Sequence, residues 1–344
     1  MAKKVYVGMS GGVDSSVTAA LLKEQGCTVT GVYMKNWSQD IPGFVCPWKE
    51  DYQDAKRVAV QLGIDFKLYD FETEYRQKVV DYMVAEYQAG RTPNPDIMCN
   101  QEVKFKLFLE TALADGADLI ATGHYARIAD GKLFTGLDKN KDQSYFLYRV
   151  TEQALHQSLM PIGELQKPEV RKLATKLGLV TATKKDSQGI CFVGKVGIKE
   201  FLLNELGPQP PGPIIDQHDH EIGEHEGALF YTIGQRHGLN VGGGLPYYVS
   251  RKDMKTNTIY VTTDLDDDSL WTQQLTLEDI HWINGQPDTD KLYQARLRYR
   301  GPLVSCKLQG KTLLLDEPQR GLAAGQSAVL YDNEQCLGGG ILSS

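Results

Sequence analysis

The chain has 344 residues and a formal net charge of −7. The length predicts two or three domains, and the acidic balance argues against a protein that coats nucleic acid with its whole surface. A hydrophobic fraction of 41% is typical of a folded globular protein. No apolar run is long enough to span a membrane, and the opening "MAKKVYVG" enters a strand pattern at once. We therefore expect a cytoplasmic protein with no membrane partner.

The first part of the chain alternates strand and helix patterns. Strands are expected at residues 3–9, 28–34, 65–71 and 118–124, and helices at 15–25, 51–63, 72–88 and 100–116. Such alternation predicts a parallel sheet with crossover helices, whose ligands bind beyond the carboxyl ends of the strands. The segments "MSGGVDS", "MKNW" and "TGHY" each follow one of these strands, so we expect the site there.

The rest of the chain changes character. A hairpin is expected at 126–136, with its turn at Asp130–Gly131, and helices are expected at 151–159, 168–178 and 195–206. The proline-rich stretch "GPQPPGPIID" (207–216) cannot lie inside an element and predicts a linker or an extended edge. Short strand patterns follow, including 227–239, 245–253 and 256–264. We predict an α/β parallel-sheet domain (1–206) followed by two small β domains (207–274 and 275–344), the last of them a β-barrel.

The turn "SGGVDS" (10–15) lies between the first strand and the first helix. It has neither the GxxxxGK[ST] spacing nor the GxGxxG spacing. Gly11 and Gly12 allow close backbone approach, and the N–H groups at the helix start, with the Ser10 and Ser15 hydroxyls, can wrap an anion. Asp14 can hold a magnesium ion bound to the phosphates. The alternative is a tight turn with a capped helix and no ligand.

This turn resembles the pyrophosphatase loop of the ATP-pyrophosphatase (PP-loop) enzymes. These enzymes split ATP between the α and β phosphates and adenylate a substrate oxygen. The resemblance implies an adenine-nucleotide-α-hydrolase-like domain that uses ATP and Mg²⁺. It also implies that the loop holds the pyrophosphate that leaves. Such a loop does not need a lysine that contacts a γ-phosphate.

Two of the six cysteines lie in chemically suggestive surroundings. Cys99, in "RTPNPDIMCNQEVKF", is expected at the start of the helix from about residue 100, where the helix dipole stabilises a thiolate. Cys191, in "KKDSQGICFVG", is expected on a glycine-flanked mobile loop behind Lys184 and Lys185, which also favour thiolate. Two such thiols suggest a sulfur relay, in which one carries a persulfide and the other resolves it.

The other cysteines give weaker indications. No CxxC pair is present, which argues against a zinc ribbon. Cys27, Cys306 and Cys336 are expected to be packing residues, and the role of Cys46 in "FVCPWKED" stays open.

Six segments in this order make the resemblance more specific: "GMSGGVDSS", "NPDIMCNQEVKF", "ATGHYAR", "KDQSYFLYRV", "SQGICFVG" and "YTIGQRHGL". Together they resemble the tRNA-specific 2-thiouridylases over most of the chain. Each member of the family has an ATP-pyrophosphatase domain followed by two β domains. It replaces O2 of the wobble uridine of tRNA with sulfur, which a sulfur-relay protein or cysteine desulfurase supplies as a persulfide.

The resemblance implies roles for individual residues. Those expected to bind ATP are Gly8, Met9, Ser10, Gly11, Gly12, Val13, Asp14, Ser15, Met34 and Gly123. Asn94, Pro95 and Asp96 are expected to meet the target uracil, with Asp96 also catalytic. Cys191 would carry the persulfide and Cys99 would attack it, leaving a transient Cys99–Cys191 disulfide. The expected tRNA contacts are His124, Lys141, Asp142, Gln143, Tyr299, Arg300 and Gln326.

The stretch "YQARLRYRGP" (293–302) is the clearest basic stripe. In a strand, Arg296, Arg298 and Arg300 would share one face, and three arginines against an acidic body predict phosphate contact. A solvated strand face is the alternative.

Three other functions stay open at this point. A PP-loop ligase or amidating enzyme would use a nitrogen nucleophile and need no cysteine pair. An iron–sulfur protein with Cys46, Cys99 and Cys191 as ligands is disfavoured by the absence of CxxC. An RNA-binding module with a vestigial ATP loop would release no pyrophosphate.

Overall fold

The computed structural model describes residues 2–43, 45–186, 197–239, 241–242, 244 and 246–343. Its N-terminal domain is built on a five-stranded parallel sheet in the order β3-β2-β1-β4-β7. The strands are β1 (Lys4–Gly8), β2 (Thr28–Lys35), β3 (Asp65–Asp70), β4 (Leu119–Ala121) and β7 (Ser158–Leu159). The four predicted strands are confirmed. β7 was missed because two residues carry no periodic pattern.

Helices cover both faces of this sheet. Val5 and Val7 of β1 pack toward one face with α1 (Val13–Glu24), α2 (Trp48–Leu62) and α8 (Lys167–Lys176). Tyr6 and Ile120 pack toward the other face, which two longer helical segments cover. The first comprises α3 (Glu72–Tyr75), a π-helical stretch (Arg76–Val80) and α4 (Asp81–Gln88). The second comprises α5 (Pro95–Met98), a π-helical stretch (Cys99–Leu107) and α6 (Phe108–Ala114). No described helix has the length and apolar character needed to cross a bilayer.

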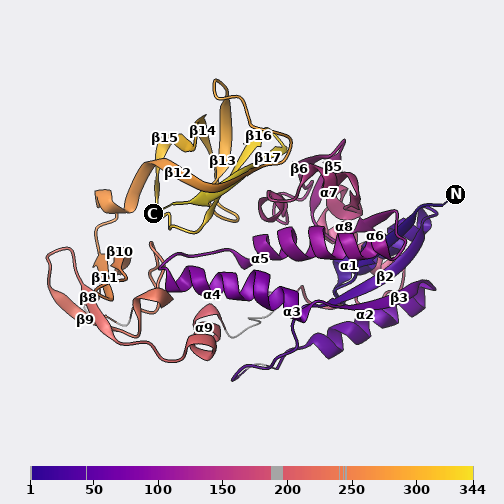
Figure 1. Cartoon of the computed structure of the whole chain (residues 1–344), viewed down its shortest axis with the longest axis horizontal. Helices are drawn as coiled ribbons and strands as arrows, with labels where there is room; N and C mark the ends of the chain where they lie inside the picture. The colour runs from indigo at the N-terminus through magenta and orange to yellow at the C-terminus, as the bar shows by residue number, and fades with distance from the viewer. Residues whose placement is uncertain are drawn as a thin grey trace.

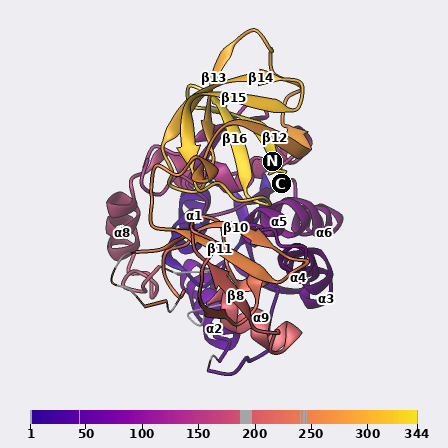
Figure 2. The same ribbon diagram turned by 90° about the vertical axis from the view of Figure 1, so that its left-hand side faces the viewer.

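Two β domains follow in the chain (Figures 1 and 2). After α7 (Glu152–His156) and α9 (Ile198–Leu206), a four-stranded central sheet forms in the order β10-β11-β8-β9. Its strands are β8 (Gly212–Ile215), β9 (Glu221–His225), β10 (Tyr248–Asp253) and β11 (Thr258–Thr262). Six strands then form a barrel that closes by pairing β12 with β17. They are β12 (Trp271–Trp282), β13 (Leu292–Arg296), β14 (Leu303–Gln309), β15 (Thr312–Arg320), β16 (Ser327–Asp332) and β17 (Gln335–Leu342). The fold class expected from the sequence is confirmed.

Two predictions about the β domains are wrong. The stretch 227–239 contains no strand but a short 3₁₀ helix (Ala228–Phe230) and turns, because Gly227, Gly234 and Gly238 adopt positive φ angles that break extended chain. The proline-rich stretch does not end in an edge strand, since β8 pairs with β9 on one side and β11 on the other.

The hairpin predicted at Asp130–Gly131 is present as β5 (Ala126–Ala129) and β6 (Lys132–Thr135). It does not stay within the N-terminal domain, because β6 pairs with β17 and extends the barrel sheet to eight strands. A continuous hydrogen-bonded sheet therefore joins the N-terminal domain to the barrel.

A buried ion pair reinforces this joint. Arg296, the last residue of β13, donates from Nη1 to Oδ2 of Asp142 (2.9 Å), and both side chains are largely buried. The expectation that Arg296, Arg298 and Arg300 share one strand face is therefore wrong. The strand ends at Arg296, whose side chain points into the domain interface, while Arg298 and Arg300 lie exposed in the following loop.

The Arg296→Ala variant tests the joint. It leaves a buried carboxylate without its cation, which costs ~3–5 kcal/mol. We expect urea unfolding, followed by tryptophan fluorescence, to show a loss of ~3 kcal/mol. The matched control Arg300→Ala removes an exposed arginine of the same segment and should change stability by less than ~0.5 kcal/mol. Equal effects for the two variants would contradict the assignment.

Candidate active site

The phosphate loop lies where the order of the parallel sheet reverses. β1 pairs with β2 on one side and β4 on the other, so the loop after β1 and the turn after β4 meet at one edge. A Cβ placed on Gly123 would lie 2.8 Å from the Ser15 nitrogen, so only glycine allows this turn to touch the start of α1. Gly11 has a φ of 74°, and a Cβ there would collide with the Asp51 backbone. The predicted ATP residues are thus brought together around a cradle that requires glycine.

Side chains of the loop differ in what they can contribute. Met9 and Val13 are buried in the core, so only their backbone can line a ligand site. The Ser15 hydroxyl accepts a hydrogen bond from the Ser10 N–H (3.2 Å) and donates to the Gly12 carbonyl (3.2 Å), which holds the loop in shape. Both serines lie where free N–H groups at a helix start favour an anion.

The end of β2 supplies the neighbouring wall. The Met34 methyl group lies 2.9 Å from where a Cβ on Gly8 would be, which confirms that β1 and β2 end side by side. Two residues further on, Asn36 Oδ1 is buried and has no hydrogen-bond partner among the described residues. A buried acceptor without a donor is costly, so a bound ligand with an amino group would fit beside it. The sequence marked "MKNW" but did not single out Asn36.

A lysine reaches the loop from a distant part of the sequence. Lys167, at the start of α8, donates from Nζ to both carboxylate oxygens of Asp14 (2.7 and 2.9 Å). The Tyr125 hydroxyl donates to the same Asp14 carboxylate (2.7 Å). The Asp14 carboxylate is therefore paired with an ammonium group, and its role as a magnesium ligand stays a prediction. No sequence motif connects residue 167 to the loop, and only the fold reveals it.

Further cations gather on a second carboxylate, Asp186. It pairs with Lys141 (2.7 Å), Lys167 (2.7 Å) and Arg171 (2.6 Å). Burial acts to raise the pKa of Asp186, but hydrogen bonds from Lys141 and Lys167 outweigh it and lower the pKa to about 2. Three cations on one carboxylate beside a phosphate loop form a site suited to an anion of higher charge. We call Lys141, Lys167 and Arg171 the cation cluster.

The helix that carries Cys99 begins earlier than predicted. α5 starts at Pro95, and the Asn94 side chain caps it by accepting hydrogen bonds from the N–H groups of Asp96 (3.1 Å) and Ile97 (3.4 Å). Cys99 therefore lies in the second turn of the helix, where the helix dipole is weaker than at the start. The predicted start at about residue 100 is therefore too late, because Pro95 occupies the first helical position, where proline is well tolerated. Asp96 and Cys99 are three residues apart and share one helix face.

The Asp96 carboxyl lies in a charged but poorly hydrated setting. Burial raises the pKa of Asp96, and the positive charge of Lys104 partly offsets this effect. The same Lys104 lies 3.5 Å from the ring of His124, which also contacts the Thr122 hydroxyl (2.8 Å). Burial lowers the pKa of His124 well below its usual value, and Lys104 lowers it further, so the imidazole is neutral. Because His124 follows Gly123, this group connects the Asn94–Asp96 segment, which is the predicted base-binding motif, to the phosphate loop.

The thiols occupy different surroundings. Cys99 is 3% exposed and packs in the core beneath the helix. Cys191 lies outside the described residues. Burial raises the pKa of Cys46 more than a backbone hydrogen bond at Trp48 lowers it, so the thiol form is favoured; its Sγ also contacts the Trp37 carbonyl (3.6 Å). Cys306 and Cys336 are fully buried, as predicted for packing residues.

All three domains meet just before the predicted base-binding motif. The Thr92 N–H donates to the Ala324 carbonyl of the barrel (2.8 Å), and its hydroxyl contacts that of Thr232 in the central domain (3.1 Å). Gly325 lies against Thr92 so closely that a Cβ would be 2.7 Å from the Thr92 nitrogen. The segment leading to Asn94 is thus fixed from both β domains.

Most residues expected to contact tRNA gather between the N-terminal domain and the barrel. The Tyr299 ring lies 4.3 Å from that of Phe146, and the Arg300 guanidinium lies over Tyr299 (5.3 Å). Gln143 accepts a hydrogen bond from the Tyr125 N–H (2.9 Å), and Gln326 contacts Ala323 in a barrel loop. Their exposure varies, and these assignments stay predictions. Lys141, Gln143, Tyr299 and Gln326 are partly exposed, Arg300 is exposed, and His124 and Asp142 are buried.

Family models match the chain in three consecutive blocks. They are described as a tRNA methyl transferase HUP domain (residues 3–195), a tRNA methyl transferase PRC-barrel domain (199–263) and an aminomethyltransferase beta-barrel domain (272–342). Together with the loop and its glycine cradle, the first match defines the class of the protein as a nucleotide-binding enzyme of the HUP type.

Full-length relatives identify the family within this class. The tRNA-specific 2-thiouridylase MnmA of Streptococcus mutans is 48% identical, with 99% of this chain and 95% of the relative aligned. The enzyme of the same name from Nitrosomonas eutropha is 48% identical over 99% and 98%. The chain belongs to the tRNA-specific 2-thiouridylase family.

Among solved structures, an NMN synthetase from Francisella tularensis is 18% identical over 54% of this chain and 66% of its own, with a TM-score of 0.36, too low to support an argument.

The Asp96→Asn variant tests the setting of the Asp96 carboxyl. A raised pKa in the folded chain means that ionisation destabilises the fold as pH rises above the ordinary value of 3.8. Relative to wild type, the variant should therefore gain stability as pH rises from 3.5, and the gain should level off above the raised pKa. Unfolding free energies measured between pH 3.5 and 7.5 check this. A variant that loses stability relative to wild type over that range would show that the carboxylate is stabilised instead.

Proposed function

We propose that the protein uses ATP to convert the wobble uridine of tRNA to 2-thiouridine. The observation that carries the proposal is the contact of Gly123 with the phosphate loop, because its neighbour His124 shares Lys104 with Asp96. A nucleotide phosphate and a base held by the Asn94–Asp96 motif would therefore be neighbours. Methyl transfer, named in the descriptions of the matching models, needs neither a phosphate loop nor a thiol.

The phosphate loop and two members of the cation cluster, Lys167 and Arg171, would hold the triphosphate of ATP. The backbone of residues 8–15 would surround the phosphates, with Met34 and Gly123 bordering the adenosine. Asn36 Oδ1 would accept a hydrogen bond from the adenine amino group. Magnesium bound at Asp14 would neutralise charge on the departing pyrophosphate, and Lys167 would be freed to pair with a phosphate oxygen.

Activation would begin at the base. Asn94 and Pro95 would position the uracil, and the Asp96 carboxylate would take the proton from N3. Uracil O2 would attack the α-phosphorus of ATP, so that the bond to the β-phosphate breaks and pyrophosphate leaves. The product is an O2-adenylated uracil, whose C2 is open to a nucleophile and whose leaving group is AMP.

Sulfur would then pass between two thiols. The terminal sulfur of a Cys191 persulfide would attack C2, and AMP would depart with the former O2 oxygen. Cys99 would attack the Cys191 sulfur, leaving the terminal sulfur on the base and forming a Cys99–Cys191 disulfide. A thiol reductant must reopen that disulfide. The persulfide would come from a sulfur-relay protein or cysteine desulfurase in the cytoplasm.

The three domains would divide the work. We assign residues 1–206 to catalysis, 207–274 to support of the base-binding segment, and 275–344 to tRNA contact. The contacts between domains at Thr92 support this division. Lys141, Gln143, Tyr299, Arg300 and Gln326 would contact tRNA, and the buried His124 and Asp142 would act through the position of their neighbours.

Cysteine variants test the relay. Wild type, Cys99→Ala and Cys191→Ala would be supplied with ATP, tRNA and a persulfide donor, and the tRNA hydrolysate analysed by mass spectrometry. We expect both variants to give at most one turnover of 2-thiouridine, because the relay needs both thiols. Cys46→Ala is the matched control and should turn over as wild type. Multiple turnovers of 2-thiouridine by either relay variant would contradict the assignment. ATP-dependent release of pyrophosphate by wild type and both variants, with no 2-thiouridine formed by any of them, would favour a nitrogen nucleophile.

Charge variants test the cation cluster. Lys167→Met should weaken inhibition by pyrophosphate and lower kcat by ~10²-fold, the usual cost of one transition-state donor. Asp186→Asn should strengthen pyrophosphate inhibition, because it removes the carboxylate that competes for the same cations. Lys172→Met, an exposed lysine of the same helix, is the control. Pyrophosphate inhibition that is unchanged in both Lys167→Met and Asp186→Asn would sink the idea.

A further inference from the structure

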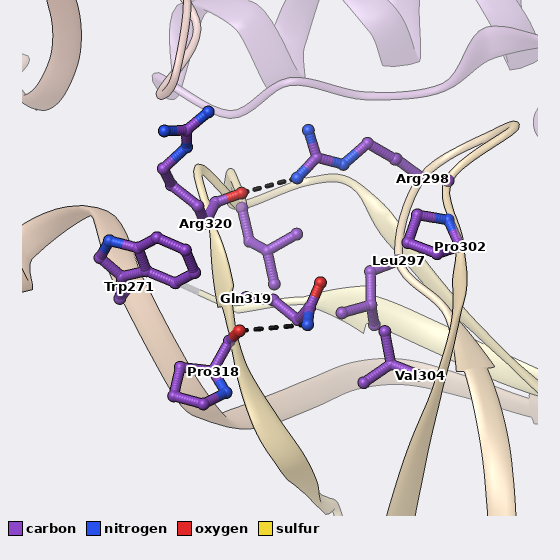
Figure 3. Close-up of a pocket in the computed structure, with 10 residues that line it drawn as sticks. Trp271, Leu297, Arg298, Pro302, Val304, Pro318, Gln319 and Arg320 are labelled. Atoms are coloured by element: carbon purple, nitrogen blue, oxygen red, sulfur yellow. Dashed lines mark hydrogen bonds between the residues drawn. The ribbon is translucent and has the colours of Figure 1, made fainter. Parts of the chain in front are cut away.

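A cavity of about 500 Å³ opens on the barrel, away from the phosphate loop. We call it the barrel cavity, and Figure 3 shows most of its lining. Its lining residues are Trp271, Leu297, Arg298, Gly301, Pro302, Val304, Pro318, Gln319, Arg320 and Leu322. None of these residues is acidic, although the chain carries a net charge of −7. A volume of this size suits a small group such as a nucleotide and not a helix.

The cavity combines an aromatic face with two arginines. Trp271 is 40% exposed, and its indole N–H is fixed by the Leu265 carbonyl (2.8 Å). The Arg320 guanidinium lies 5.9 Å from the Trp271 ring, and Arg298 donates to the Arg320 carbonyl (2.6 Å). Figure 3 shows both guanidinium groups on the side that faces the violet ribbon of the N-terminal domain. Unpaired nucleotides are bound by this combination, in which aromatic and guanidinium planes stack on bases.

Arg298 and Arg320 have no carboxylate partner among the described residues. Arg296, by contrast, pairs with Asp142. An arginine held by a backbone carbonyl beside an acid-free cavity keeps donors available for an incoming anion. The apolar wall formed by Leu297, Val304 and Leu322 excludes water from one side of the cavity. These features complement a base with a phosphate attached better than they complement an acidic peptide, which needs no apolar wall.

The barrel cavity is also close to the base-binding motif. Leu322 lines the cavity, Ala324 accepts the hydrogen bond from Thr92, and Asn94 lies two residues beyond Thr92. Two residues on each side of the hydrogen bond, at ~3.5 Å per residue, and ~7 Å from one Cα to the other across the bond give a path from Leu322 to Asn94 of at most ~21 Å. Tyr299 and Arg300, which are expected to contact tRNA, directly follow Arg298. An RNA that places one nucleotide at Asn94 can therefore place another in the barrel cavity.

We propose that the barrel cavity binds one unpaired nucleotide of the tRNA, other than the uridine that is modified, with its base against Trp271 and its phosphate at Arg298. This inference rests on the proposed function, since it takes tRNA as the substrate. The contact would contribute to tRNA affinity and not to the chemical step, because no lining residue lies at the phosphate loop or at Cys99.

Binding of labelled tRNA, followed by fluorescence anisotropy, tests the proposal. Trp271→Ala should weaken binding on the order of ten-fold, the usual effect of losing one stacked base, and Trp271→Phe should restore most of it. Arg298→Ala should weaken binding and reduce the slope of log affinity against log salt by ~1. Lys311→Ala, which removes an exposed cation from a turn of the same barrel, is the control. In thiolation assays the Trp271 and Arg298 variants should raise KM for tRNA and leave kcat unchanged.

Wild-type tRNA affinity in both Trp271→Ala and Arg298→Ala would overturn the proposal. If these variants also thiolate tRNA at the wild-type rate with sodium sulfide but slowly with a protein sulfur donor, the cavity would be assigned to that protein. A wild-type enzyme that neither binds tRNA nor forms 2-thiouridine would instead refute the proposed function. Circular dichroism of each variant establishes that the comparison is made on folded protein.

Discussion

The joint between the N-terminal domain and the barrel is the constraint on which the rest of the structure depends. β6 adds to the barrel sheet through β17, and the buried Arg296–Asp142 pair is a second link between the N-terminal domain and the barrel. With the barrel held in this way, its loop at Ala324 reaches the Thr92 backbone and fixes the segment that leads to Asn94. The segment that we propose to bind the base is therefore held by more than one domain. The contacts that hold it include specific hydrogen bonds as well as apolar packing.

The active site assembles its charges from distant parts of the sequence. A loop without lysine receives Lys167 from α8, and Lys141 and Arg171 join it on Asp186. Carboxylates hold these cations in place, so an entering polyphosphate can replace one anion with another at little cost in solvation. Burial acts differently on Asp96 and His124, which lie near these charges. It favours the neutral form of each side chain, which suits contact with an uncharged base.

Much of this could be predicted from the sequence, because periodicity and turn residues are local signals. The four longer strands of the sheet, the hairpin at Asp130–Gly131 and the loop at residues 10–15 were identified in this way. Contacts between segments far apart in the chain left no such signal. The pairing of Lys167 with Asp14, the inward turn of Arg296 and the addition of β6 to the barrel depend on tertiary packing. The early start of α5 was a local error, since Asn94 followed by Pro95 is a typical helix start.

The proposed function requires that the uracil oxygen meet the α-phosphorus of ATP in the space between the phosphate loop and the Asn94–Asp96 motif. An oxygen-18 label at O2 of the wobble uridine tests this most directly, with AMP analysed by mass spectrometry after a single turnover. The account predicts that the label appears in the AMP phosphate, with one labelled AMP for each sulfur incorporated. Sulfur incorporation accompanied by unlabelled AMP would contradict it.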